Sequence, residues 1–136
     1  MIKQPVRLYT AVYGIFGAIQ ATISLARSFY PPLDQAFPAL LVIPHMIPIH
    51  STLHLVTGIL ALVIFYRSGE RGAFWFAFGF GLFYLSLGLA GMFSGHQFGL
   101  GLQPFDHPFH IFIGALGLLA AAPTIYHSIT QKKVSI

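Results

Sequence analysis

The chain contains no cysteine and very few charged residues. Without cysteine there is no disulfide, thiolate-ligated zinc site, iron–sulfur cluster or cysteine nucleophile. Charged side chains account for 7% of the 136 residues, against about 25% in an ordinary soluble domain. Hydrophobic residues make up 56% of the chain, and its mean hydropathy is +0.76. These proportions exclude an ordinary soluble domain and indicate a single, small integral membrane domain.

Long uncharged stretches divide the chain into four parts. They cover residues 8–26, 35–66, 72–105 and 107–131. A membrane helix needs about 20 apolar residues, because about 30 Å of hydrocarbon is crossed at about 1.5 Å per residue. Each stretch holds one such helix, since Pro38, Pro44 and Pro48 interrupt the first half of the second stretch. We therefore predict an all-α fold, an integral membrane four-helix antiparallel bundle that forms one domain over residues 1–136.

Prolines and glycines set the expected helix boundaries. Pro31 and Pro32 end the first helix, and Pro48 suits the first turn of the second. A glycine-rich loop over residues 94–104 separates the third helix from the fourth, where Asp106 is placed to act as N-cap. We expect helices at about 6–26, 48–66, 73–93 and 107–130.

Basic residues are distributed unevenly across the predicted membrane. Six of the seven fall on one side, and Arg27 lies alone on the other. The six are Lys3, Arg7, Arg67, Arg71, Lys132 and Lys133. The positive-inside rule then predicts a multi-pass protein of the cell membrane with both termini in the cytoplasm. Because the basic residues are scattered at helix ends, the formal net charge of +4 indicates contact with the lipid bilayer and no nucleic acid partner.

The second and fourth predicted helices contain related segments, which indicates an internal repeat. Residues 48–62 align with 104–118, and the alignment pairs Pro48 with Pro104, His54 with His110 and Gly58 with Gly114. A weaker match pairs residues 14–16 with 81–83. The chain therefore reads as two copies of a two-helix unit, related by an axis along the membrane normal.

These paired segments carry a resemblance to a known family. Together with residues 43–48 and 98–104 they resemble a domain-of-unknown-function family of small four-helix bacterial membrane proteins, with a histidine-rich second helix and an aspartate at the start of the fourth. The resemblance covers about residues 8–122 and implies the four-helix fold and its topology. It implies no chemistry, because the family has no established activity. His50 and Asp106 occupy the polar positions of the family pattern, whereas His107 departs from it.

Histidine is the residue type whose distribution has chemical content. Six of the seven histidines map to the non-cytoplasmic half of the predicted bundle. They are His45, His50, His54, His96, His107 and His110. Polar side chains in a membrane helix normally face the bundle interior. We therefore expect His50, His54, Asp106 and His110 to converge between the second and fourth helices.

Three interpretations of this cluster stay open. The histidines form hydrogen bonds across the bundle and stabilise helix packing, with Gly58 and Gly114 allowing close approach of the helices. Alternatively, His50, His54, Asp106 and His110 form the site of a divalent metal such as zinc, copper or nickel, with Asp106 either as a ligand or as a partner that orients a histidine ligand. In the third interpretation His54 or His110 binds a haem or a chlorophyll-type pigment.

An enzymatic role has less support in the sequence. His50 and His54 have the spacing of a zinc-binding helix, but the glutamate of His-Glu-x-x-His is absent. Asp34 and Glu70 fall in loops away from the cluster, which leaves Asp106 as its one carboxylate. We therefore expect a non-enzymatic structural protein, or an accessory subunit of a larger membrane complex or homo-oligomer. The alternative is a protein that binds a metal, haem or pigment through the histidine cluster.

Overall fold

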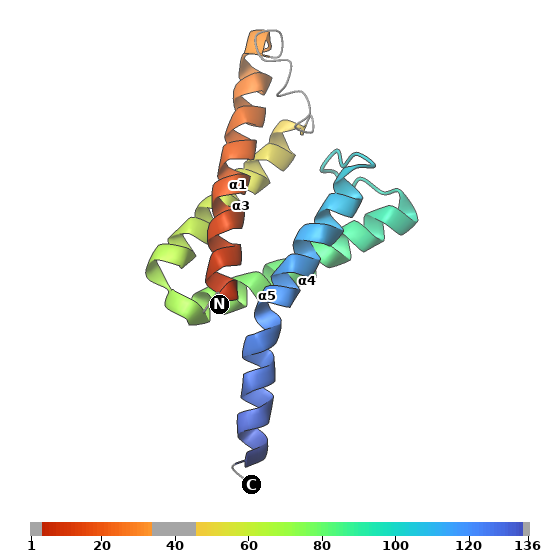
Figure 1. Ribbon diagram of the computed structural model, residues 1–136. Coiled ribbons are helices and arrows are strands. Elements are labelled where there is room, and N and C mark those ends of the chain that lie inside the picture. The colour runs from red at the N-terminus through yellow and green to blue at the C-terminus, as the bar shows by residue number, and fades with distance from the viewer. Residues whose placement is uncertain (1–3, 34–45, 135–136) are drawn as a thin grey trace.

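The computed structural model describes residues 4–33 and 46–134 and contains four long helices (Figure 1). They are α1 (Pro5–Phe29), α3 (Pro48–Arg67), α4 (Gly69–Ser94) and α5 (Asp106–Val134). Each is long and apolar enough to cross a membrane, and no strand occurs among the described residues. The all-α, four-helix membrane fold is thereby confirmed. Lys3, Asp34 and His45 lie outside the described residues, so the positions predicted for them stay predictions.

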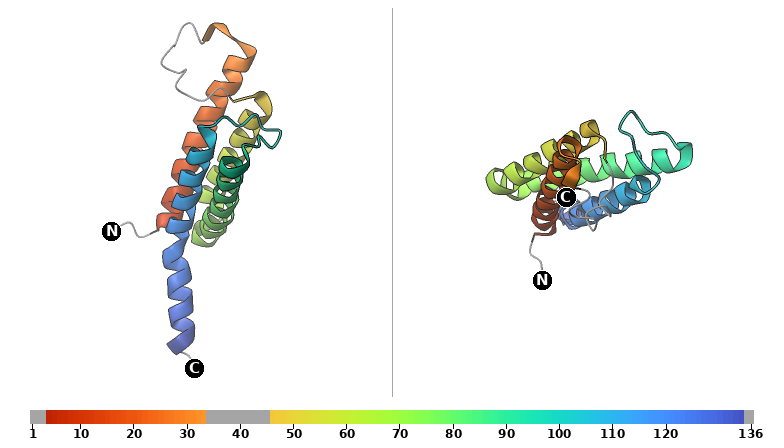
Figure 2. Two further views of the ribbon diagram at one scale, coloured as in Figure 1. Left: turned by 90° about the vertical axis from the view of Figure 1, so that its right-hand side faces the viewer. Right: turned by 90° about the horizontal axis from the view of Figure 1, so that it is seen from above.

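The four helices form two hairpins. Helix α1 packs along α3 and α4 packs along α5, and the hairpins meet through α1 with α4 and α5 and through α3 with α4. No Cα atom of α3 lies within 8 Å of a Cα atom of α5. Helix α5 extends beyond the other helices (Figure 2), and none of its residues from 122 to 130 is buried. The space between α3 and α5 is therefore bridged by side chains and not by close backbone contact.

Glycines allow the helices within each hairpin to pack closely. A Cβ atom added at Gly58 of α3 would lie 3.2 Å from the carbonyl oxygen of Gly14 in α1. A Cβ atom at Gly114 of α5 would lie 2.7 Å from the carbonyl oxygen of Gly81 in α4. These contacts are typical of membrane helices that approach each other through small residues. The sequence alignment pairs the same glycines, although the duplication itself stays a prediction.

The first helix is longer than predicted. Helix α1 continues to Phe29 and not to about residue 26, because the N–H of Tyr30 still bonds to the carbonyl of Ala26 at 2.8 Å. Tyr30 itself is not helical, with φ −137° and ψ 79°. A residue that precedes a proline is sterically disfavoured in the helical region, so the helix ends immediately before Tyr30 and Pro31.

The predicted start of the third helix, at about residue 73, is also wrong. Helix α4 begins at Gly69, directly after Ser68 at the end of α3. Gly69 has φ +61°, a left-handed conformation that lets the chain reverse without a longer loop. Glu70 therefore lies in the first turn of α4, where its negative charge interacts favourably with the helix dipole. At the other end of the chain, α5 runs to Val134 and not to about residue 130.

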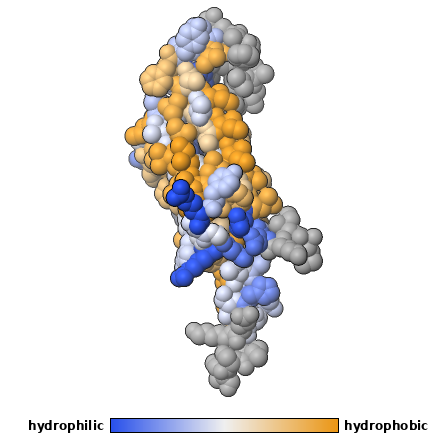
Figure 3. Space-filling view, turned by 90° about the vertical axis from the view of Figure 1, so that its left-hand side faces the viewer, coloured by the Kyte–Doolittle hydropathy of each residue, from blue (hydrophilic) through white to orange (hydrophobic). Residues whose placement is uncertain are grey.

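Large apolar side chains are exposed on all four helices. Figure 3 shows hydrophobic residues over much of one face and hydrophilic residues gathered toward the end where α5 protrudes. The guanidinium of Arg7 donates a hydrogen bond to the carbonyl of Phe65 at 3.1 Å and lies 4.9 Å from the centre of its ring. Arg7 and Arg67 therefore lie at the same end of the molecule. Four apolar helices with this exterior make the chain a multi-pass membrane protein.

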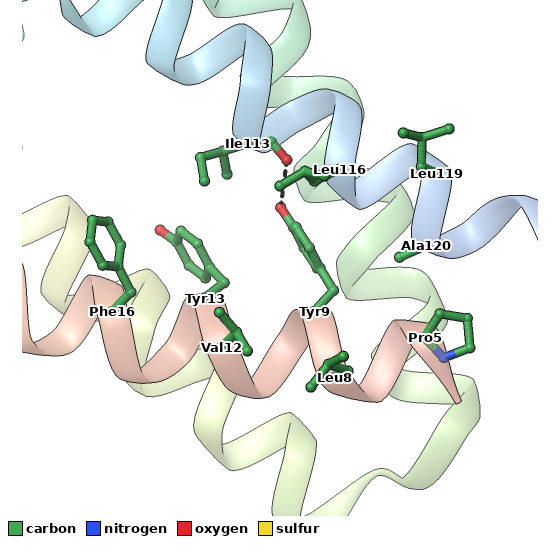
Figure 4. A pocket seen from close by; sticks show the side chains of 10 residues that line it. All are labelled: Pro5, Leu8, Tyr9, Val12, Tyr13, Phe16, Ile113, Leu116, Leu119 and Ala120. Carbon is green, nitrogen blue, oxygen red and sulfur yellow. Dashed lines mark hydrogen bonds between the residues drawn. The ribbon is translucent and has the colours of Figure 1, made fainter. Parts of the chain in front are cut away.

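Helices α1 and α5 also line an apolar cavity of about 440 Å³. Figure 4 shows Leu8, Val12 and Phe16 on the α1 side and Leu116 and Leu119 on the α5 side. The hydroxyl of Tyr9 crosses from α1 and donates a hydrogen bond to the carbonyl of Ile113 at 3.1 Å (Figure 4). This bond joins the two hairpins at the cavity.

Candidate functional site

His50 and His54 lie in the first two turns of α3. Pro48 occupies the first turn, where its missing N–H removes no helical hydrogen bond, and the N–H of Ser51 bonds to the carbonyl of Ile47 at 3.0 Å. The spacing of four residues places both imidazoles on the same face of the helix. Both are buried, each with 3% of its surface exposed.

Asp106 organises the start of α5, although not as predicted. Its carboxylate accepts a hydrogen bond from the N–H of Gln103 at 2.7 Å, and its own N–H donates to the carbonyl of Gln103 at 2.9 Å. These two bonds close a turn over residues 103–106, in which the side chain of Asp106, the first residue of α5, reaches back to the preceding loop. The prediction that Asp106 is the N-cap is therefore wrong, because its carboxylate bonds to the backbone that precedes it.

Three of the four predicted residues come together between α3 and α5. One ring nitrogen from each of His50, His54 and His110 lies within 4.8 Å of the other two. The ring centres of His50 and His54 are 4.7 Å apart, and His110 lies 5.9 Å from His50 and 6.3 Å from His54. Asp106 is buried and acts electrostatically on His50, but it is outside this group of three.

The buried polar groups of the helices differ sharply in whether they have partners. The hydroxyl of Ser51 donates to that of Ser24 at 2.8 Å, and Thr10 donates to the carbonyl of Val6 at 2.7 Å. In residues 4–33 and 46–130, in contrast, five buried side-chain atoms have no hydrogen-bond partner: Oε1 of Gln20 and Nδ1 of His50, His54, His107 and His110. Leaving such an atom without a partner costs about 1–3 kcal/mol. Three of these five atoms belong to the histidine cluster, so its imidazoles retain unused binding capacity.

Hydrogen bonds between helices use few of the imidazole nitrogen atoms in the cluster. Nε2 of His54 lies within hydrogen-bonding distance of the hydroxyl of Tyr84 in α4, at 3.3 Å. Most of the ring pairs meet edge to face, with the ring centre of Tyr84 4.8 Å from that of His110 at an angle of 86°. Such ring contacts hold the imidazoles in place without using their nitrogen atoms.

A cavity of about 180 Å³ adjoins the three histidines. Its walls are mainly apolar and include Leu53, Phe83, Leu87 and Leu100, the last from the loop between α4 and α5. Pockets for drug-sized ligands have volumes of about 300–1,000 Å³. The cavity therefore has room for an ion with one or two small ligands, and not for a porphyrin.

Tyr84 is the site residue that sequence reasoning missed. It is buried, with 5% of its surface exposed, and its ring contacts both His54 and His110. One signal was present: Tyr84 is the single tyrosine in a helix rich in phenylalanine. A hydroxyl in a membrane helix normally faces the bundle interior, where it finds a polar partner.

Two other described histidines, His96 and His107, lie outside the group of three. The ring of His107 packs against Gly91 of α4. His96 is exposed, and its Nδ1 accepts a hydrogen bond from the N–H of Phe98 at 2.9 Å. The cluster therefore contains fewer histidines than their distribution along the sequence indicated.

Fold and site together define a class: a multi-pass, four-helix membrane protein with three buried, converging histidines. Within that class the chain belongs to the family described as Domain of unknown function (DUF4383), whose model matches residues 7–126. The resemblance inferred from the sequence is thereby confirmed. No curated protein and no solved structure matches the chain.

Proposed function

We propose that the protein binds one first-row transition-metal ion through His50, His54 and His110. The observation that carries this proposal is the convergence of three buried imidazoles whose ring nitrogens lie within 4.8 Å of one another. Neutral imidazole is the commonest protein ligand for such ions and suits zinc, copper and nickel. The Nδ1 atoms of these three histidines have no hydrogen-bond partner, so no existing hydrogen bond at Nδ1 would have to break for an ion to bind there.

The geometry requires a small contraction of the site. In a tetrahedral zinc site, bonds of about 2.0–2.1 Å separate neighbouring ligand atoms by roughly 3.3–3.4 Å. The largest separation, up to 4.8 Å, would therefore shrink by about 1.4 Å. Ring rotation supplies this movement at His50 and His110, whose Nδ1 atoms are held by no hydrogen bond. Three protein ligands leave a fourth position for a small exogenous ligand in the adjoining cavity.

Asp106 supports the site from outside the three ligands in this proposal. Its carboxylate is held by the N–H of Gln103 and acts electrostatically on His50. A negative charge beside a histidine ligand favours a bound cation and strengthens the imidazole as a ligand. A haem or a chlorophyll-type pigment is less well supported, because the cavity of about 180 Å³ is too small for a macrocycle.

Metal analysis and cobalt substitution test the proposal. Detergent-purified protein supplied with Zn²⁺ is expected to retain one equivalent after gel filtration, and Co²⁺ is expected to give the visible absorption of a tetrahedral site. His54→Gln and His110→Gln should each abolish stoichiometric binding, whereas His127→Gln should not, because His127 is exposed and far along α5. Absence of stoichiometric metal in the unaltered protein, or a Soret band in its spectrum, would overturn the proposal.

If no ion binds, the alternative is the structural or accessory role that is expected from the composition. It is non-enzymatic, and the exposed apolar side chains would then contact lipid, a larger membrane complex or a second copy of the chain. In that case each histidine substitution should cost about 1 kcal/mol or less, as is typical of interhelical hydrogen bonds in membranes.

We also propose that the protein lies in the cell membrane with both termini in the cytoplasm. The uneven distribution of basic residues supports this orientation. The bond from Arg7 to the carbonyl of Phe65 supports it further, because it holds the start of α1 beside the end of α3. The histidine cluster, near the starts of α3 and α5, would then lie toward the non-cytoplasmic face.

A further inference from the structure

Very few residues determine the charge of the histidine cluster. His50, His54 and His110 would bind an ion as neutral imidazoles, so the three ligands contribute no negative charge. Asp106 and Glu70 are the acidic residues in the part of the chain that the structure describes. Glu70 lies in the first turn of α4, at the opposite end of that helix from the loop that leads to Asp106. Asp106 is therefore the one described acidic residue at this end of the molecule.

Asp106 lies near the cluster without being one of its ligands. It precedes His110 by four residues in α5, so the two side chains lie on the same face of the helix. Only 4% of its surface is exposed, and its carboxylate accepts a hydrogen bond from the N–H of Gln103 at 2.7 Å. It is outside the group of three histidines. The carboxylate can therefore compensate one positive charge at the site without occupying a coordination position.

The surroundings of the cluster make a net charge costly. The three histidines are 3%, 3% and 1% exposed, and the walls of the adjoining cavity include Leu53, Phe83, Leu87 and Leu100. Transfer of an ion from water into such low-dielectric surroundings is unfavourable. In the Born description the cost rises with the square of the net charge, so it is about four times larger for a divalent than for a monovalent ion. With Asp106, a monovalent ion gives a neutral site, whereas a divalent ion leaves one buried positive charge.

We propose that the ion held by His50, His54 and His110 is monovalent copper, Cu(I), in preference to a divalent ion such as Zn²⁺. The inference rests on the proposed metal site and specifies its ion. Imidazole is a suitable ligand for copper. Three imidazoles complete a trigonal site for Cu(I), whereas Zn²⁺ almost always takes a fourth ligand. The charge of the site and its number of ligands therefore favour the same ion.

Competition titrations of the full-length protein in detergent test this preference. The affinity for Cu(I) is measured without oxygen against bicinchoninate, and the affinity for Zn²⁺ against a fluorescent zinc chelator. The unaltered protein is expected to bind Cu(I) at least about 100-fold more tightly than Zn²⁺, because an uncompensated buried charge is strongly unfavourable. X-ray absorption of the copper-loaded protein should show three nitrogen neighbours around Cu(I).

Two substitutions change the charge of the site in opposite directions. His50→Glu replaces a neutral ligand with a carboxylate, so it should lower the preference for Cu(I) over Zn²⁺ at least about 10-fold. His50→Gln is the matched control, since it removes the same imidazole without adding a charge and should not lower the preference. Asp106→Asn should increase it. Because attraction to a unit charge is proportional to the charge of the ion, a 10- to 100-fold loss of Zn²⁺ affinity corresponds to about a 3- to 10-fold loss for Cu(I).

Each preference is a ratio of two affinities measured on the same variant, so a loss of folding stability affects both ions alike. Binding of Zn²⁺ as tightly as Cu(I) would overturn the assignment of Cu(I) and leave the metal site in place. The same holds for a preference that His50→Glu lowers no more than His50→Gln does. Failure to bind either ion would overturn the metal site itself, and the assignment with it.

Discussion

Replacement of Gly58 by alanine tests whether close helix contact determines the structure of the first hairpin. The added Cβ atom would lie 2.7 Å from the backbone nitrogen of Ala18 and 3.1 Å from the carbonyl carbon of Gly17. Ordinary van der Waals contact begins at 3.4 Å, so α1 and α3 must separate by about 0.7 Å. No flexible side chain can absorb this movement, because the atoms that the methyl group meets belong to the backbone.

The expected cost follows from the loss of contacts along the interface. A gap of about 0.5–1 Å removes a quarter to a half of the dispersion energy of each atom pair, and overpacking of this kind typically costs about 1–3 kcal/mol. Alanine is a better helix former than glycine by about 1 kcal/mol, which offsets part of the loss. We therefore expect Gly58→Ala to be destabilising by about 1–2 kcal/mol.

The measurement is reversible unfolding in detergent, followed by circular dichroism, with Gly79→Ala as the matched control. Gly79 lies inside α4 with no atom within 4 Å of an added Cβ, so the same substitution should leave stability unchanged or raise it slightly. Gly58 is also one turn from His54, so Gly58→Ala should weaken Zn²⁺ binding as well. Equal unfolding midpoints for Gly58→Ala, Gly79→Ala and the unaltered protein would refute the inference of tight packing.

Three further predictions concern the site and the topology. Asp106→Asn keeps an oxygen acceptor for the N–H of Gln103 but removes the carboxylate that acts on His50. The Zn²⁺ affinity, measured by competition with a chelator, should therefore fall about 10- to 100-fold while the fold is retained. An unchanged affinity would show that Asp106 does not support the site. Zn²⁺ affinity should also decrease as the pH is lowered, because protons compete with the ion for three imidazoles, and an affinity independent of pH would contradict histidine ligation. A reporter fused after Ile136 should be cytoplasmic and one inserted at Gly101 should be outside, so detection of both on the same side would contradict the four-span topology.

Hydrophobicity and chain length alone determined the architecture of this protein. Four uncharged stretches, each with room for one span, lead to four helices because a bilayer leaves no other way to satisfy the backbone. Pro48 marked the start of α3 correctly, since the missing N–H of a proline costs no hydrogen bond in the first turn of a helix. The end of α1 and the start of α4 were missed, because they depend on whether one residue, Tyr30 or Gly69, can adopt a particular backbone conformation.

Only the tertiary structure decided which polar side chains form the site. The spacing of His50 and His54 predicted that they share a face, because one helix determines their relation. Their distance from His110 depends instead on how the two hairpins cross, and so does the position of Tyr84. Asp106 has the sequence position of a ligand, yet its carboxylate bonds to Gln103 and stays outside the three histidines. Hydrophobic periodicity describes one helix at a time. The contacts between helices arise instead from close packing at Gly58 and Gly114, and the sequence of one helix does not specify which residues of another helix it will meet.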